Sequence, residues 1–168
     1  MARKISDKRL NKLLELNKQL AVENDFSKRI RLISETIKEM LKIDRCSIFL
    51  HDEDSKSMWS VYIDGVSYIE VPDDKGVVGK VYKTKKTVIL NDIQSDSPLN
   101  NNIDKGSGYT TKSILAIPIM GYSGDVLGVI ELINKLDGSE GFTKEDEKIL
   151  SYVMGHISAY LELMIQGK

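Results

Sequence analysis

Two apolar segments, residues 114–120 and 126–133, are separated only by the five-residue turn from Gly121 to Asp125. Aliphatic segments of this length, joined by so short a turn, predict two antiparallel strands that form a hairpin. Both segments are apolar almost without interruption, so the hairpin is expected near the centre of a sheet. This feature limits the chain to folds that are built around an antiparallel sheet.

A change of hydrophobic period marks the first strand of that sheet, residues 45–51. The period there is two, which places Cys46 and Ile48 on one face and Ser47 and Phe49 on the other. Further strands are expected at residues 58–63, 68–71, with Pro72 as a stop, and 87–90.

Apolar residues at mixed spacings of three and four predict the helices. They are expected at residues 7–23 and 26–42, in about two turns from Gly76, and at residues 145–166. Asp25 is a suitable N-cap for the second helix, and Thr143 with Asp146 forms an approximate capping box for the last one. The polar stretch 91–112 has little periodicity, and a loop of this length indicates function or a small embedded helix.

The order of elements places strands next to one another in the sequence, which predicts hairpins and the α+β class, with helices on one face of an antiparallel sheet. Residues 1–24 are expected to form a connecting helix and residues 25–165 the domain itself. The C-terminal helix, at about residues 144–166, is expected to lead to an output domain that is absent from this chain.

Composition excludes several classes of function. The net charge is −1, so no polycationic surface for a nucleic acid polymer is expected. Cys46 is the only cysteine and can form neither an internal disulfide nor a thiolate metal site, which favours a reducing, cytoplasmic compartment. No apolar run approaches the roughly 20 residues of a membrane span. His51 and His156 lack the spacing of metal ligands, so neither a metal nor another cofactor is expected.

Five segments of the chain resemble, in order, the GAF domains of cyclic-nucleotide phosphodiesterases and adenylyl cyclases. Residues 44–50 resemble the first strand of that family, and residues 76–81 resemble its helix-opening glycine segment. The polar lid of the family and the strand that follows it are similar to Asn91-Asp92 and residues 108–119. Its last strand is similar to residues 126–135. The most specific match is the N-K…F-x-x-x-D-E signature, formed here by Asn134, Lys135, Phe142, Asp146 and Glu147.

The resemblance implies a six-stranded GAF sheet with the terminal helices on one face and a lid of short helices on the other. It implies a regulatory module that binds cAMP or cGMP between the sheet and the lid. The ligand-binding positions that it implies are Ser47, Asp64, Val77, Val78, Asn101, Ser107, Tyr109, Thr111 and Glu131.

Most of these positions have a chemical reason to bind a nucleotide, and Asn101 is the main departure from the family pattern. The backbone N–H groups of Val77 and Val78 open a helix, where an anionic phosphate is stabilised. The resemblance places Ser47 beside the base, and Asp64 either binds a purine or serves the Asp-Gly turn. Lid hydroxyls can donate to phosphate or ribose. Asn101 lies in a run of three asparagines, where the relatives carry aromatic residues. A carboxylate in the apolar strand around Glu131 requires a partner, which is expected in the pocket.

The signature itself is expected to support the pocket instead of touching the ligand. Lys135 ends a strand and Asp146 begins a helix, so an ion pair between them would hold the strand exit against the helix start. Phe142 would fill the space before the helix as an apolar plug. Asn134 and Glu147 complete this structural group.

Other functions remain open or are disfavoured. A ligand-free scaffold for dimerisation and signal relay, or a sensor for another small molecule, is the alternative to nucleotide binding. Enzyme activity is not expected, because the reductases in one branch of the family need at least two cysteines and Cys46 stands alone. A parallel homodimer is expected through coiled-coil spacing of two sets of residues. These are Leu10, Leu13, Asn17, Leu20 and Asn24 at the start, and Leu150, Met154, Ile157, Leu161 and Met164 at the end.

Overall fold

The computed structural model describes residues 7–65, 68–93, 108–137 and 140–166. Six strands form one antiparallel sheet in the order β3-β2-β1-β6-β5-β4. They are β1 (Ile43–Asp52), β2 (Ser57–Ile63), β3 (Glu70–Pro72), β4 (Val88–Leu90), β5 (Ile114–Met120) and β6 (Val126–Lys135). The prediction of an α+β fold around an antiparallel sheet is confirmed.

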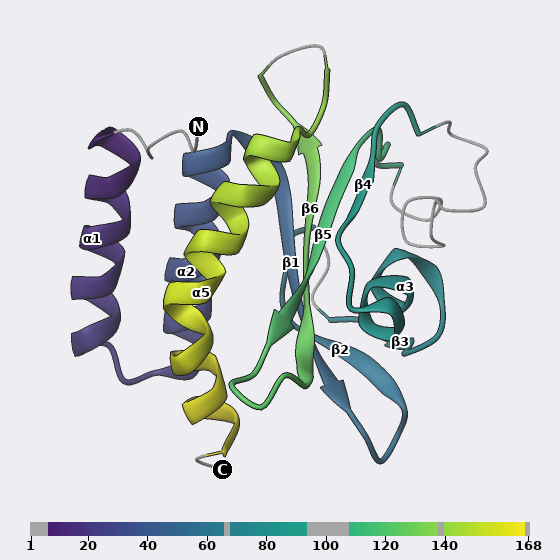
Figure 1. Ribbon diagram of the computed structural model, residues 1–168, viewed down its shortest axis with the longest axis horizontal. Coiled ribbons are helices and arrows are strands. Elements are labelled where there is room, and N and C mark those ends of the chain that lie inside the picture. Colours follow the sequence, from purple (N-terminus) through teal and green to yellow (C-terminus); the bar gives the residue numbers. More distant parts are fainter. Residues whose placement is uncertain (1–6, 66–67, 94–107, 138–139, 167–168) are drawn as a thin grey trace.

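The helices divide between the two faces of the sheet (Figure 1). One face is covered by α2 (Phe26–Leu41) and α5 (Lys144–Gln166), and the other by α3 (Gly76–Thr84). α1 (Asp7–Val22) packs against α2, on the side away from the sheet. In the described part of the chain, no helix has both the length and the apolar character needed to cross a membrane.

Each face has its own apolar core because side chains alternate along the strands. Cys46 and Ile48 of β1 belong to the core beneath α2 and α5, whereas Phe49 packs with the valines of α3. This alternation is the one that the hydrophobic period of residues 45–51 predicts. Ser47 therefore lies on the α3 face with Phe49.

The helix caps also follow the sequence. The Asp25 carboxylate accepts a hydrogen bond of 2.9 Å from the Lys28 N–H at the start of α2. At the start of α5, the Thr143 N–H donates to Asp146 Oδ2 and the Asp146 N–H donates to Thr143 Oγ1, at 3.0 and 3.2 Å. The predicted capping box thus satisfies two of the backbone donors at this helix start.

Two details of the sheet differ from the prediction. β3 is shorter than expected and includes Pro72, which an edge strand tolerates because its outer side needs no partner. The centre of the sheet is β1 with β6, not the β5–β6 hairpin. The reason is that β5 is followed only by the three residues of β4 at the sheet edge, whereas β1 joins β2 to β6.

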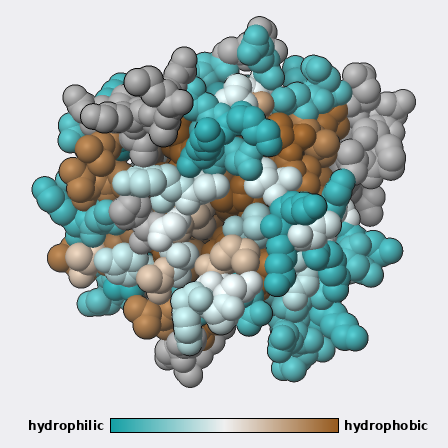
Figure 2. Space-filling model, in the orientation of Figure 1, coloured by the Kyte–Doolittle hydropathy of each residue, from teal (hydrophilic) through white to brown (hydrophobic). Residues whose placement is uncertain are grey.

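The residues of the predicted coiled-coil seam pack within the single chain instead of forming a dimer interface. Leu13 and Leu20 of α1, and Leu150, Ile157 and Leu161 of α5, are fully buried in the core of this single chain. The seam prediction was therefore wrong: the same spacing serves helix packing within the domain. The side chain of Met164 lies outside the described residues. On the side where α1 lies, Figure 2 shows apolar patches interspersed with hydrophilic ones. Leu10 and Leu14 of α1 are exposed.

Candidate ligand-binding site

The sheet face beneath α3 carries two buried polar side chains next to each other. Ser47 of β1 is directly opposite Glu131 of β6, and Glu131 is opposite Ala116 of β5. Their exposed fractions are only 3% for Ser47 and 8% for Glu131. Val129 and Ala116 belong to the apolar core on this face, so Glu131 has the orientation that its place in the strand predicts. A carboxylate in such surroundings is costly unless it is hydrogen-bonded.

The N-terminus of α3 lies over the same face. Lys75 precedes the helix with extended backbone and makes no side-chain cap hydrogen bond, and Gly76 has a φ of 65°. The first N–H groups of a helix have no partner within the helix, and here no side chain at the N-cap takes one of them. Val77 and Val78 are buried against the sheet by their side chains. Their backbone amides lie in the first turn of α3, where the sequence predicts an anion site.

Gly79 lets the preceding turn approach the first turn of α3. A Cβ at this position would lie 2.8 Å from the carbonyl carbon of Asp74 and 3.1 Å from the carbonyl oxygen of Asp73. Both are backbone atoms, which cannot yield without moving the turn. The glycine therefore serves close packing, and it does so at the point where α3 meets the loop from β3.

Asn134 anchors the segment that leads into β5. Its Oδ1 accepts from the N–H groups of Lys112 and Ser113 at 2.7 and 3.2 Å, and its Nδ2 donates to the Tyr109 hydroxyl and the Thr110 carbonyl at 2.9 and 2.8 Å. Its φ is 62°, a conformation that asparagine tolerates better than most residues. An amide is needed here because it both donates and accepts. The signature residue Asn134 thus holds residues 109–113, the segment that leads into β5, against the end of β6.

Tyr109 is held by this anchor and by the start of β1. Its hydroxyl donates to Asp44 Oδ2 at 2.5 Å, and the Arg45 guanidinium lies 3.5 Å from the centre of its ring. Burial, with the hydrogen bond to Asp44, raises the pKa of Tyr109 to about 12. The Tyr109 hydroxyl is therefore hydrogen-bonded within the protein. The sequence-based prediction of Tyr109 as a ligand-binding residue did not include these partners. Thr111, close by, is buried.

Asp64 lies at α2 and not beneath α3. Its oxygens accept from Lys38 Nζ at 3.0 and 3.2 Å, from the Cys46 N–H at 3.0 Å and from the Tyr62 hydroxyl at 3.1 Å. Burial opposes the charge of Lys38, but hydrogen bonds to Asp64 and Glu35 raise the pKa of that lysine. These contacts hold α2 against the strand ends, and the assignment of Asp64 as a purine contact stays a prediction.

The predicted ion pair of the signature is present. Lys135 Nζ lies 3.0 Å from Asp146 Oδ1, and the two side chains are only 9% and 7% exposed. Lys135 Nζ also donates to the Leu41 carbonyl, a contact that the sequence did not indicate. The lysine therefore joins three elements: the C-terminus of α2, the end of β6 and the start of α5. A cation is favoured at a helix C-terminus.

The other two signature residues are also structural in their contacts. Phe142 is buried in the core, as an apolar plug should be, and its backbone N–H and C=O both bond the Asn91 side chain, at 3.0 and 3.1 Å. Glu147 makes a 3.2 Å ion pair with Lys144, which is exposed. Sequence reasoning grouped Asn91 with the lid, and the structure shows it holding the loop before α5.

The two remaining predicted contacts, Asn101 and Ser107, lie outside the described residues. Of the others, the structure brings Ser47, Glu131 and the α3 N-terminus together on one face and leaves Asp64 and Tyr109 in separate networks. Within the described ranges, no group of three or more His, Cys, Asp or Glu residues is placed to hold a metal ion.

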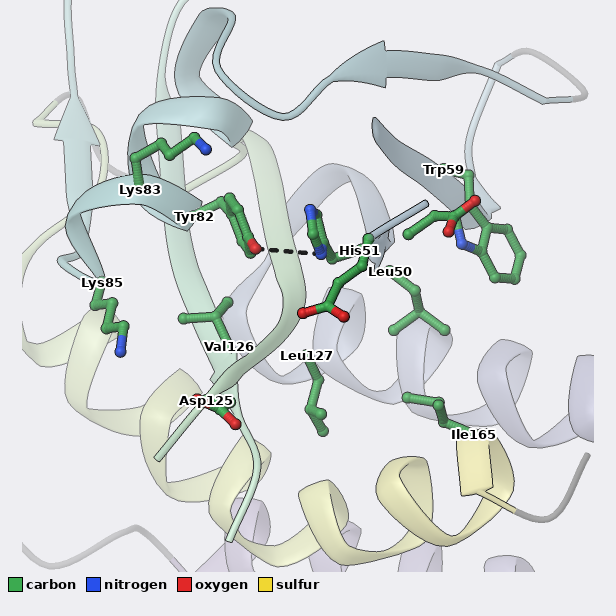
Figure 3. A pocket seen from close by; sticks show the side chains of 12 residues that line it. Leu50, His51, Trp59, Tyr82, Lys83, Lys85, Asp125, Val126, Leu127 and Ile165 are labelled. Carbon is green, nitrogen blue, oxygen red and sulfur yellow. Dashed lines mark hydrogen bonds between the residues drawn. The ribbon is translucent and has the colours of Figure 1, made fainter. Parts of the chain in front are cut away.

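A cavity of about 920 Å³ lies at the other end of α3 (Figure 3). Its lining includes His51, Trp59, Tyr82 and Leu127, and it contains none of the predicted contact residues that the structure describes. The sequence did not single out this region. The only signal was the position of His51 on the same strand face as Ser47 and Phe49.

Comparison with known proteins defines the class. The model for the GAF domain matches residues 25–161, so the chain belongs to the GAF family. GAF domains are regulatory modules that bind small molecules.

Two particular relatives are phosphodiesterases. The chain is 33% identical over 150 residues to dual 3',5'-cyclic-AMP and -GMP phosphodiesterase 11A of Takifugu rubripes, covering 82% of this chain and 17% of the relative. It is 34% identical over 140 residues to the cone cGMP-specific 3',5'-cyclic phosphodiesterase subunit alpha' of Bos taurus, covering 74% of this chain and 16% of the relative. The chain thus spans about a sixth of the length of these relatives.

Solved structures support the fold. The GAF domain from a phosphoenolpyruvate-protein phosphotransferase of Coxiella burnetii superposes with a TM-score of 0.77 at 20% identity, covering 95% of this chain and 96% of that chain.

Proposed function

We propose that this chain is a sensor domain that binds a cyclic purine nucleotide, cAMP or cGMP, on the sheet face beneath α3. The observation that carries the proposal is the pair of buried polar side chains, Ser47 and Glu131, beside the uncapped N-terminus of α3. The relatives named above act on these two nucleotides, which supports the choice of ligand.

The cyclic phosphate of the ligand suits the N-terminus of α3, and its purine base suits the polar side chains of the sheet. A cyclic phosphate carries one negative charge, which the backbone N–H groups of Val77 and Val78 at a helix start would stabilise. A purine base presents N–H donors, which the Glu131 carboxylate would accept. Ser47 would bond the base edge, and Thr111 would add a hydroxyl from the segment before β5.

Binding would be relayed through the terminal helices. Glu131 and Lys135 belong to the same strand, and Lys135 contacts both the end of α2 and the start of α5. A shift of β6 toward a ligand would therefore act on two helices at once. An output domain attached to residues 25–165 would receive the signal through residues 1–24 or through α5.

The test is calorimetric titration of the protein with cAMP, cGMP, AMP and GMP. We expect a cyclic nucleotide to bind more tightly than its linear monophosphate, because the second phosphate charge of the linear form would be left without a partner. Glu131→Gln should weaken binding about tenfold or more, the worth of a hydrogen bond to a charged group. Glu147→Gln is the matched control, because Glu147 belongs to α5 and its side chain pairs with the exposed Lys144.

Failure would take one of two forms. Equal or tighter binding of AMP or GMP would refute selection for the cyclic phosphate. A folded protein that binds neither cyclic nucleotide would favour the alternative, a ligand-free scaffold or a sensor for another small molecule. The engagement of Asp64 and Tyr109 by protein partners is the observation that keeps this alternative in view.

A further inference from the structure

The position of α3 depends on contacts with the rest of the chain. The helix has nine residues and no side-chain N-cap, and isolated helices of this length are unstable in water. On the sheet side, Val77, Val78 and Val81 pack into the core. Beside the last turn, Tyr82 and Lys83 line the 920 Å³ cavity, so side chains do not pack closely around that part of the helix.

One side chain of β1 contacts both ends of the segment that contains α3. His51 Nε2 lies 2.9 Å from Asp73 Oδ2, in the turn before the helix. His51 Nδ1 lies 3.2 Å from the Tyr82 hydroxyl, in the last part of the helix. The His51 and Tyr82 rings are stacked, with centres 4.1 Å apart and planes 20° from parallel, and Figure 3 shows them facing each other across this bond.

The donors and acceptors of the two hydrogen bonds that join Asp73, His51 and Tyr82 are compatible with one another. A carboxylate only accepts, so the His51 Nε2–H donates to Asp73. In the tautomer that carries its proton on Nε2, Nδ1 accepts from the Tyr82 hydroxyl. The hydrogen bond from His51 lowers the pKa of Asp73, with a further contribution from Lys83. Burial and the charge of Asp73 raise the pKa of Tyr82, which keeps its proton.

The turn before α3 is fixed at a second point. The Asp73 N–H donates to the Lys56 carbonyl at 3.1 Å, and Lys83 Nζ lies 3.6 Å from Asp73 Oδ1. Asp73 is therefore tied to the β1–β2 turn, to β1 and to α3. His51 is the member of this group that stands on the strand of Ser47, four residues further along.

We infer that His51 is a positioning residue, which through Asp73 and Tyr82 holds α3 in place over the Ser47–Glu131 pair. The role in ligand binding rests on the proposed function. The role in placing α3 does not. The His51 ring on β1 contacts residues at both ends of the helix segment. These contacts keep the first-turn amides of Val77 and Val78 at a fixed distance from the strand that carries Ser47.

The experiment compares Tyr82→Phe with Tyr122→Phe. The first substitution removes the hydroxyl that bonds His51 and keeps the stacked ring. The second removes the hydroxyl of an exposed tyrosine in the β5–β6 turn. Hydrogen exchange of the ligand-free protein is followed by mass spectrometry, with the amides of α3 compared with those of β6. Binding of cAMP and cGMP is measured by calorimetry on the same samples.

Tyr82→Phe should speed exchange in α3 about fivefold or more, the change that corresponds to one lost hydrogen bond, and leave β6 unchanged. It should weaken binding of the preferred nucleotide by a similar factor. In a His51→Ala background, Tyr82→Phe should have no further effect, because both act through one bond. Should His51→Ala not fold, Asp73→Asn takes its place as the background, with a less than additive effect expected.

Unchanged exchange in α3 would overturn the inference outright. Faster exchange in α3 with unchanged nucleotide affinity would overturn the claim that His51 positions the ligand site. Absence of nucleotide binding by the wild type would refute the proposed function alone, because the exchange measurement needs no ligand and still decides whether His51 places α3.

Discussion

Replacing Lys135 with methionine retains most of the side-chain length and removes the charge that contacts Asp146 and the Leu41 carbonyl. The Lys135 and Asp146 side chains are 9% and 7% exposed, so the remaining Asp146 charge would stay largely out of water. Removing one partner of a buried pair costs about 3–5 kcal/mol. For a chain of 168 residues, 1 kcal/mol corresponds to about 2–4 °C in Tm. We therefore expect Lys135→Met to lower Tm by about 6 °C or more.

Thermal unfolding monitored by circular dichroism measures this effect, with and without cyclic nucleotide. The loss should be present in both conditions, since Lys135 contacts helices and not the ligand face. Lys144→Met is the control: this lysine is also paired with a carboxylate, at 3.2 Å, but it is exposed, and such pairs contribute about 0–1 kcal/mol.

A double variant separates the ion pair from other effects of the substitution. Asp146→Asn keeps an oxygen for the Thr143 N–H and removes only the charge. Combined with Lys135→Met it should destabilise less than the sum of the single changes, by about 1–3 kcal/mol. Two results would refute the role of Lys135 as the link between α2, β6 and α5. One is a Lys135→Met protein that melts within 2 °C of wild type, which is about the shift of 1 kcal/mol or less. The other is strict additivity of the two single changes.

Three further predictions concern single residues. Asn134→Ala should lower the free energy of unfolding by about 2 kcal/mol or more in urea denaturation, through lost amide hydrogen bonds and a positive φ, and Asn134→Gly should lose less because glycine adopts that φ freely. Cys46 is fully buried and burial raises its pKa to about 12, so iodoacetamide should leave it unmodified at pH 8 by mass spectrometry until urea unfolds the protein; rapid labelling of the native protein would contradict this. The folded-state pKa of Asp73 is lowered, so its contribution to stability is present above about pH 3.9 and is lost as pH falls through the folded value. Asp73→Asn should therefore flatten the dependence of urea midpoints on pH below about 4, and an unchanged acid limb would disprove the assignment.

Local patterns predicted most of the fold and part of the site. The period of two in β1 identified the face of Ser47, and the apolar run of β6 identified the face of Glu131. The Lys135–Asp146 pair was predictable because one residue ends a strand, the other begins a helix, and the two are eleven positions apart. These features depend on neighbours in the sequence or on one strand–helix junction.

The partners of Asp64 and Tyr109 could not be predicted in the same way. Asp64 meets Lys38, 26 positions away, and Tyr109 meets Asp44, 65 positions away. Such contacts depend on which strand ends come together, and the hydrophobic period carries no information about that. The terminal helices show the same limit, because a spacing of three and four residues serves a coiled coil and an internal core equally.

The burial of α1 sets a threshold for any partner of this domain. Leu13, Leu16 and Leu20 fix α1 to its own chain, and burial of each leucine contributes about 2 kcal/mol, or about 6 kcal/mol together. A second chain that sought the surface beneath α1 would compete with a helix tethered beside it through residues 23–25. α1 thus acts as an intramolecular competitor, and a partner can displace it only by stabilising this surface more than α1 does.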